Sequence, residues 1–177
     1  MIKKILFVLL LLVGLFLIGC NNGMNSEEDG VIMPNDMPDD FMFSLKYGVK
    51  ALNEINTFEQ TYTKDLVLDG TVTTELELTK AELRKIYQKM KEIEILDTVL
   101  KAVYIGEDGA ETHIEPRSDY YLTVQINEEI YSVEWTNNIH DEDTRNELAR
   151  FVNFLHDEII SIKSEYLGLP EPSGSYQ

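Results

Sequence analysis

Hydrophobic and polar residues alternate along much of the chain, and the period of this alternation predicts strands. From 41 to 49 every second residue is hydrophobic, which is typical of a half-buried strand. A second strand is expected at 58–68 on the same pattern. Two polar residues, Gln60 and Lys64, lie on the hydrophobic face of that second strand. The pattern therefore predicts two neighbouring strands, of which the second is less regular.

The alternation continues into three more predicted strands. Residues 72–78 form a third strand, and Asp69-Gly70 before it predicts a hairpin turn, because glycine adopts a positive φ without strain. A second hairpin is expected over 119–136, with its turn at 127–129. These segments bring the predicted sheet to about five strands.

Two segments have helical spacing instead. Thr79 and Glu82 form a capping box at the start of a helix expected over 80–94. A second helix is expected from 141 or 142 to 164, because acidic residues favour the positive end of a helix. The hydrophobic stripe of the first helix is Leu83, Ile86, Tyr87, Met90 and Ile93, and that of the second is Leu148, Phe151, Val152, Leu155, Ile159 and Ile162.

The segment 95–118 has two interpretations. Residues 99–105 could form a strand that pairs with 112–114, or the whole segment could be a long loop. With either interpretation the order is two or three strands, a helix, two strands and a helix. The sequence therefore predicts an α+β fold, an antiparallel sheet with both helices on one face, because that arrangement would bury both hydrophobic stripes.

The N-terminus has the pattern of a secretory signal. Lys3 and Lys4 precede an uninterrupted apolar run, 5–18, and the only cysteine of the chain, Cys20, follows closely. The apolar run is shorter than the roughly 20 residues that a membrane-spanning helix needs. An uncleaved signal anchor is the alternative.

The sequence Leu17-Ile18-Gly19-Cys20 resembles the lipobox of bacterial lipoproteins. The resemblance implies that residues 1–19 are a signal peptide cleaved between Gly19 and Cys20. It also implies that Cys20 carries a diacylglycerol thioether with fatty acids such as palmitate. The expected location is then the cell membrane, with the protein facing away from the cytoplasm, in a bacterium of Gram-positive type.

Composition limits the partners of the protein. Its 177 residues include 32 acidic and 15 basic ones, a net charge of −17 that becomes −19 when residues 1–19 and their two lysines are removed. That charge argues against nucleic acid as a partner, because binding phosphates requires many basic residues. It also means that lipid on Cys20, not a basic patch, must hold the protein at an anionic membrane. With one cysteine the chain forms no internal disulfide.

The domain boundaries follow from composition. Residues 20–40 are expected to be a lipidated tether, because they carry six acidic residues, no basic residue and two prolines. A cation site at Asp36, Asp39 and Asp40 is the alternative. A single α+β domain is expected over 41–168, and an extended tail over 169–177.

Residues 43–49, 53–58, 63–65 and 169–174 are similar to small bacterial lipoproteins to which no activity is attached. This second resemblance would cover most of residues 41–177. It supports the expected location and adds no chemistry.

The sequence contains no recognisable catalytic or metal motif. It lacks a Gly-x-Ser-x-Gly elbow, and no pair among His113, His140 and His156 has ligand spacing. Ser44 and Lys46 share a strand face, which we interpret as an exposed polar face. A weak cation site at the turn 107–109 is an alternative to a plain turn. No catalytic residue, metal or cofactor is expected.

Two groups of residues are candidates for binding a partner. The first helix carries the only concentration of basic residues, which is either a docking surface or a solvated face that offsets acids elsewhere. An arginine and two aromatic residues near the second hairpin form the other group, unless they are ordinary sheet aromatics. The candidates are Lys80, Arg84, Lys85, Lys89, Lys91, Arg117, Tyr121 and Trp135.

These observations favour a non-enzymatic, lipid-anchored module that binds an envelope protein or acts as an accessory subunit. A small-ligand or peptide sensor is the alternative, and an envelope hydrolase is a third possibility. The open face of the sheet discriminates between them, since a flat exposed surface there would argue against a ligand site on the sheet. The side chains expected on that face are Thr61, Thr63, Glu75, Tyr121 and Thr123.

Overall fold

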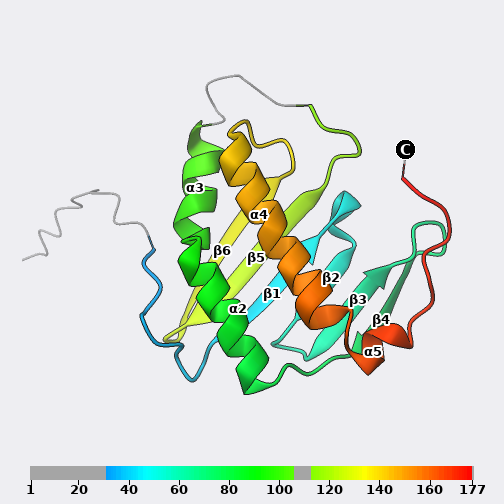
Figure 1. The fold of residues 1–177 in the computed structure, drawn as a ribbon, viewed down its shortest axis with the longest axis horizontal. Coiled ribbons are helices and arrows are strands. Elements are labelled where there is room, and N and C mark those ends of the chain that lie inside the picture. The colour runs from blue at the N-terminus through cyan, green and yellow to red at the C-terminus, as the bar shows by residue number, and fades with distance from the viewer. Residues whose placement is uncertain (1–30, 106–112, 177) are drawn as a thin grey trace, which may run out of the picture.

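A six-stranded antiparallel sheet forms the centre of the computed structural model, which describes residues 31–105 and 113–176 (Figure 1). The strand order is β4-β3-β2-β1-β5-β6, so β1 joins a four-stranded meander to the β5–β6 hairpin. The predicted α+β class is confirmed, with one strand more than expected. The strands are β1 (Met42–Tyr47), β2 (Asn53–Asn56), β3 (Thr61–Asp65), β4 (Thr71–Glu75), β5 (Asp119–Ile126) and β6 (Glu129–Thr136).

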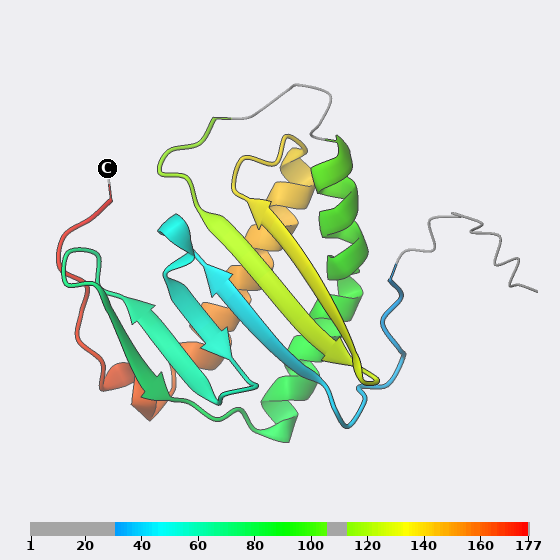
Figure 2. The ribbon, with the colours of Figure 1, turned by 180° about the vertical axis from the view of Figure 1, so that it is seen from behind.

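Helices cover one face of this sheet and leave the other face open (Figure 2). Three of them, α2, α3 and α4, lie across the covered face (Figure 1). The π-helical turn η3 continues α4 directly, and the 3-10 turn η1 follows β1. The elements are η1 (Val49–Ala51), α2 (Lys80–Glu92), α3 (Ile95–Ile105), α4 (Glu142–Phe154), η3 (Leu155–Ile160) and α5 (Ser164–Leu167).

The core lies between the sheet and the helices. Leu45 in β1 is opposite Ile55 on one side and Leu122 on the other, and all three side chains are buried. Because side chains alternate across a strand, the same period puts Ser44 and Lys46 on the open face. The predicted stripe of α2 packs onto this layer with Ile86, Tyr87, Met90 and Ile93 buried, and Leu83 packs against it.

Both predicted helix starts are confirmed. The Thr79 hydroxyl accepts a hydrogen bond from the Glu82 amide, and the Glu82 carboxylate accepts one from the Thr79 amide, which is the capping box. Asp141 caps α4 by accepting from the Thr144 amide at 2.8 Å. The second helix is shorter than predicted, since the chain leaves the π-helical turn after Ile160, and Ile162 is 65% exposed rather than part of the stripe.

The second predicted strand, 58–68, is wrong at both ends. Its centre is β3, but Phe58 and Leu68 lie outside the sheet and are exposed. A short strand that the sequence did not predict, β2, precedes it. Only Ile55 of β2 is buried, so no hydrophobic alternation marks this strand.

The segment 95–105 is neither a strand nor a loop but the helix α3. Ile95, Leu96 and Val99 are buried in the core, whereas Leu100 is 50% exposed. The spacing of the three buried residues fits one face of a helix. The turn predicted at 106–109, with its alternative cation site, lies outside the described residues.

Residues 31–40 belong to the folded body and not to a tether. Met33 is 6% exposed, the Tyr87 hydroxyl donates to the Pro34 carbonyl at 2.7 Å, and Asp40 accepts hydrogen bonds from the amides of Asn127 and Glu128. The predicted boundary at 41 is therefore too late. The signal peptide, Cys20 and residues 21–30 lie outside the described residues.

No helix in the described part of the chain has the length and apolar character needed to span a membrane.

Replacing Met33 with alanine tests whether the segment 31–40 is part of the fold. We expect Met33→Ala to lower the free energy of unfolding by about 2 kcal/mol, the lower end of the cost of truncating a buried methionine. Ile32→Ala is the matched control, because Ile32 is 89% exposed, and we expect a change within about 0.5 kcal/mol. Urea denaturation measures both values. Equal effects would contradict the packing of this segment.

Candidate functional site

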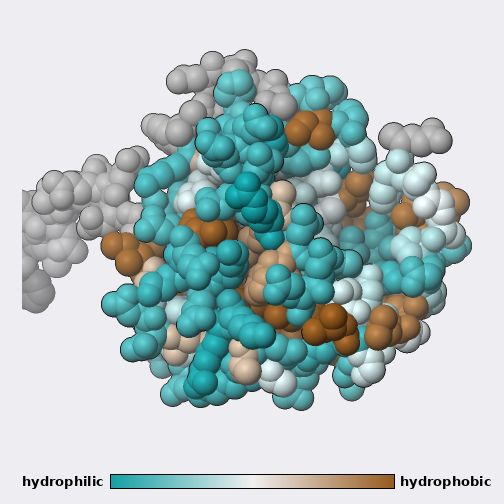
Figure 3. Space-filling model, viewed as in Figure 1, coloured by the Kyte–Doolittle hydropathy of each residue, from teal (hydrophilic) through white to brown (hydrophobic). Residues whose placement is uncertain are grey.

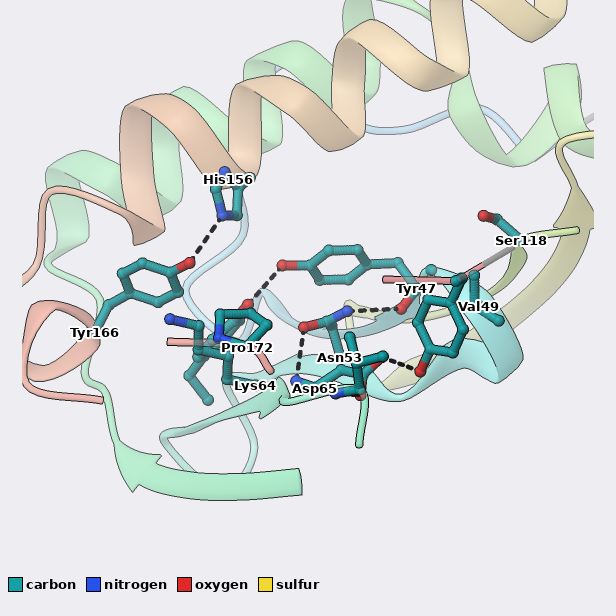
Figure 4. Close-up of a pocket in the computed structure, with 13 residues that line it drawn as sticks. Tyr47, Val49, Asn53, Lys64, Asp65, Ser118, His156, Tyr166 and Pro172 are labelled. Atoms are coloured by element: carbon teal, nitrogen blue, oxygen red, sulfur yellow. Dashed lines mark hydrogen bonds between the residues drawn. The ribbon is translucent and has the colours of Figure 1, made fainter. Parts of the chain in front are cut away.

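A pocket of about 380 Å³ opens at one end of the helix-covered face (Figure 4). The sheet supplies its floor from the ends of β1, β2 and β3, and the helical side supplies His156 and Tyr166. The C-terminal tail completes the wall. The lining residues are Tyr47, Gly48, Val49, Asn53, Tyr62, Lys64, Asp65, Val67, Ser118, His156, Tyr166, Pro172 and Tyr176.

A sharp change of chain direction after β1 creates one side of this pocket. Gly48 has φ 91°, and a Cβ atom at this position would lie 3.1 Å from the side-chain nitrogen of Asn53. Glycine is thus favoured by the backbone conformation, and a side chain here would also crowd Asn53. The same Asn53 side chain accepts a hydrogen bond from the Asp65 amide at 3.0 Å, which fixes β2 to the end of β3.

Two buried tyrosines meet on the floor of the pocket. The hydroxyl oxygens of Tyr47 and Tyr62 lie 2.8 Å apart and share a hydrogen bond. Burial raises the pKa of Tyr47 above its ordinary range. Burial also raises the pKa of Tyr62 to about 12, although the hydrogen bond from Tyr47 opposes this shift. Both phenols are therefore neutral at physiological pH and provide hydroxyl groups rather than charge.

Lys64 and Asp65 are the two charged residues that are buried in the described part of the chain, and both line the pocket. Asp65 is fully engaged: its carboxylate accepts from the Val67 amide at 2.8 Å and from the Tyr176 hydroxyl at 2.6 Å. That second hydrogen bond raises the pKa of Tyr176 to about 12. The Asp65 carboxylate therefore has its hydrogen-bond partners within the protein.

Lys64 has weaker partners. Its side chain is 5% exposed, and its Nζ lies 3.7 Å from a carboxylate oxygen of Glu171, a side chain that is itself 91% exposed. The Nζ also lies 4.6 Å from the centre of the Tyr166 ring, a cation–π contact that Figure 4 shows. No described residue accepts a hydrogen bond from this ammonium group, which has three donors.

The C-terminal tail is held beside β3. The Ser173 amide donates to the Leu66 carbonyl at 3.0 Å, and the Leu68 amide donates to the Ser173 carbonyl at 3.3 Å. Together with Tyr176 and Asp65, these bonds fix Pro172 and Glu171 at the pocket mouth. The tail is therefore part of the site.

His156 is oriented from both sides of its ring. Its Nε2 lies 3.2 Å from the Tyr166 hydroxyl and its Nδ1 lies 2.8 Å from an Asp157 oxygen. No serine, threonine or cysteine side chain among the described residues is hydrogen-bonded to it. The histidine thus holds the Tyr166 side chain in place.

The basic residues predicted on the first helix mostly contact the protein itself. Lys80 pairs with Asp39 at 3.1 Å, Lys91 donates to the Asn35 side chain at 2.9 Å, and Lys89 pairs with Glu92 at 3.3 Å. Arg84 and Lys85 are exposed. This helix face therefore serves in part to bind the acidic segment 31–40, which agrees with the interpretation that its charges offset acids elsewhere.

The second predicted group does not assemble. Trp135 is 5% exposed and stacks on Tyr120 with ring centres 5.0 Å apart, so it belongs to the core. Tyr121 is 47% exposed on the opposite face of the sheet. Arg117 pairs with Asp119 at 2.9 Å. The prediction of Trp135 as an exposed anchor is wrong, because the period of β6 directs it towards the helices.

The open face of the sheet is polar. Thr61, Thr63 and Thr123 are half-buried, whereas Glu75 and Tyr121 are exposed, and the strand register puts all five on the same face as Ser44 and Lys46. The Ser44 hydroxyl on this face donates to Glu54 at 2.8 Å. The pocket lies on the other face of the sheet, the one that the helices cover.

Metal-ligating side chains do not converge. In residues 31–105 and 113–176, no three histidine, cysteine, aspartate or glutamate side chains are grouped so as to hold a metal ion. Of the three aspartates considered as a cation site, Asp39 pairs with Lys80, and Asp40 accepts hydrogen bonds from the β5–β6 turn.

The pocket was not predicted from the sequence, although one signal was present. Lys64 interrupts the hydrophobic face of a strand. A lysine at such a position must either extend its ammonium group to water or pair with another group. The other walls come from segments far apart in the chain. No family model, no curated protein and no solved structure matches the chain.

The raised pKa of Tyr62 predicts a pH effect on stability. This pKa is about 12 in the folded state and about 10 in an unfolded chain. Between these two values the folded state keeps the phenol proton of Tyr62, whereas the unfolded chain loses it. The contribution to stability is complete below pH 10 and is lost as the pH rises to about 12. We expect Tyr62→Phe to show a smaller loss over this range than the wild type, measured by urea unfolding at each pH. If the free energy of unfolding falls equally with pH in the variant and in the wild type, the raised pKa of Tyr62 is contradicted.

Proposed function

We propose that this protein is a non-enzymatic, lipid-anchored module outside the cytoplasm that binds a small ligand in the Lys64 pocket. The observation that carries the proposal is a lysine whose side chain is 5% exposed, whose ammonium group faces a pocket of about 380 Å³, and from which no described residue accepts a hydrogen bond. A pocket of this size lined by aromatic rings and a few polar groups is typical of small-molecule sites.

The surface gives less support to the other binding function, docking of an envelope protein. Such a site needs exposed aromatic or arginine anchors. Trp135 is buried, and Lys80 and Lys91 are engaged with the segment 31–40. The helix side of the molecule is mainly hydrophilic, with hydrophobic residues gathered near α5 (Figure 3). We therefore propose the pocket, and not the basic helix, as the binding site.

The pocket chemistry supports binding over catalysis. A hydrolytic site needs a nucleophile beside a base, or a metal ion. The two ring nitrogens of His156 contact Asp157 and Tyr166, and the carboxylate of Asp65 is held by Val67 and Tyr176. These groups position one another, and Lys64 is left to contact a ligand.

The lipid anchor rests on the lipobox resemblance at Cys20. Eleven residue steps lead from Cys20 to Val31, so this stretch could reach at most about 40 Å at 3.3–3.6 Å per residue. The folded body would thus stay near the bilayer, while the charge of −19 on residues 20–177 is repelled by an anionic surface.

Replacing Cys20 with alanine tests the anchor. We expect Cys20→Ala to accumulate as an uncleaved, unlipidated precursor, because the thioether forms on the cysteine sulfur. Intact-mass measurement of the protein from membranes distinguishes the two forms. The wild-type chain expressed in parallel is the control, and normal maturation of the variant would contradict the lipoprotein assignment.

A pocket-filling variant tests ligand binding. Small molecules would be screened by ligand-observed NMR against the protein purified from membranes in detergent. We expect a set of hits that is lost in Ser118→Trp, which fills the pocket, and kept in Thr123→Trp, which adds the same ring to the open face. Binding that is the same for both variants, or no hits at all, would contradict a ligand site in this pocket.

A further inference from the structure

We propose that the ligand is a small organic carboxylate with an apolar or aromatic body, and that its carboxylate replaces Glu171 as the partner of Lys64. This inference rests on the proposed function, since it names the ligand class of the same pocket. It joins three features: a lysine whose side chain is buried up to an ammonium group that faces the pocket, a weak internal partner that is exposed to solvent, and hydroxyl donors beside them.

The burial of Lys64 is the first step. Taking an ammonium group out of water is costly unless it is paired and hydrogen-bonded. Asp65, the neighbouring buried charge, meets this condition through two hydrogen bonds within the protein. Lys64 does not, because no described residue accepts from its Nζ, and since no fully buried side-chain nitrogen among the described residues lacks a partner, this Nζ faces the solvent of the pocket. The three donors of this group point to an anionic acceptor inside the pocket.

Glu171 marks the position that such an acceptor would take. Its oxygen lies 3.7 Å from Nζ, beyond hydrogen-bond distance, and its side chain is 91% exposed. An ion pair of this kind contributes little to stability. A ligand carboxylate could therefore displace it at small cost, and the tail that carries Glu171 would keep its bonds through Ser173 and Tyr176.

The tyrosine pair supplies a second donor. Two hydroxyl groups that share one hydrogen bond leave one proton free to donate, and both phenols are neutral at physiological pH. Tyr62 lies two residues before Lys64 on the same face of β3, so both groups line the same wall. One ammonium and one hydroxyl match the two oxygens of a carboxylate.

The charge of the pocket favours a carboxylate over a phosphate. A phosphate carries up to two negative charges, whereas Lys64 is the only buried basic side chain in the described residues. The Asp65 carboxylate also lines the pocket and would repel the additional charge. The rings of Tyr62 and Tyr166, together with Val49 and Pro172, provide contacts for an apolar body.

The test compares acids with their isosteric amides. Acetate and acetamide, benzoate and benzamide, and 3-phenylpropionate and 3-phenylpropionamide would be titrated into the protein purified from membranes in detergent, with inorganic phosphate as a further probe. Isothermal titration or the shift of the unfolding midpoint reports binding. We expect at least one acid to bind at least about tenfold more tightly than its amide, and phosphate to bind more weakly than that acid.

Two variants assign the effect to Lys64. In Lys64→Met, which keeps the length of the side chain, we expect the preference for the acid to be lost while any binding of the amide persists. In Glu171→Gln we expect the acid to bind about two- to fivefold more tightly, because an exposed competing ion pair of modest strength is removed. The second variant changes an exposed side chain, so it keeps the test valid if Lys64→Met fails to fold.

The outcomes separate the two proposals. Amides that bind as well as acids would overturn the carboxylate inference and leave the pocket as a ligand site. Phosphate that binds more tightly than every acid would overturn it in the same way. If neither acids nor amides bind at millimolar concentration, the carboxylate inference fails. The proposed function is then decided by the ligand screen that compares Ser118→Trp with Thr123→Trp.

Discussion

The position of β1 between β2 and β5 is the constraint on which the rest of the structure depends. This strand joins two halves of the sheet that are far apart in the chain, and its core-facing side chains Phe43 and Leu45 are fully buried. Hydrophobic burial across this junction is what makes one sheet out of a meander and a hairpin. The end of the same strand, at Tyr47 and Gly48, also opens the pocket. The strand β1 thus contributes both to the core and to the candidate site.

Much of this fold was predictable because hydrophobic residues recur with a clear period. The α+β class, the β5–β6 hairpin, both helix starts and most of the two stripes follow from alternation and capping. The strand β2 could not be predicted, because Ile55 is its only buried residue and its pairing with β1 and β3 is set by tertiary contacts. The helix α3 is a similar case, since its short apolar run fits a strand or a helix equally well until its neighbours are known.

The candidate site was harder to predict than the fold. Its walls come from three strands, a π-helical turn, α5 and the tail, and no local pattern links segments that are so far apart. Only Lys64, a charge on a hydrophobic strand face, gave a signal in advance. The residues that did attract attention have other roles: Trp135 is in the core, and Lys80 and Lys91 hold the segment 31–40. In this acidic protein, basic residues on the helix α2 thus form ion pairs and hydrogen bonds with the protein itself.

The strong negative charge of the protein limits what the pocket can do. A protein with a net charge of −17, or −19 without residues 1–19, repels an anionic ligand, and salt at 0.1 M screens this repulsion beyond about 10 Å. Lys64 acts only at short range, inside a site where screening is weaker. Recognition of an anion would thus depend on a single buried contact and not on steering by the surface. In the proposed complex, the shape of the pocket and the charge of Lys64 would select the ligand at short range.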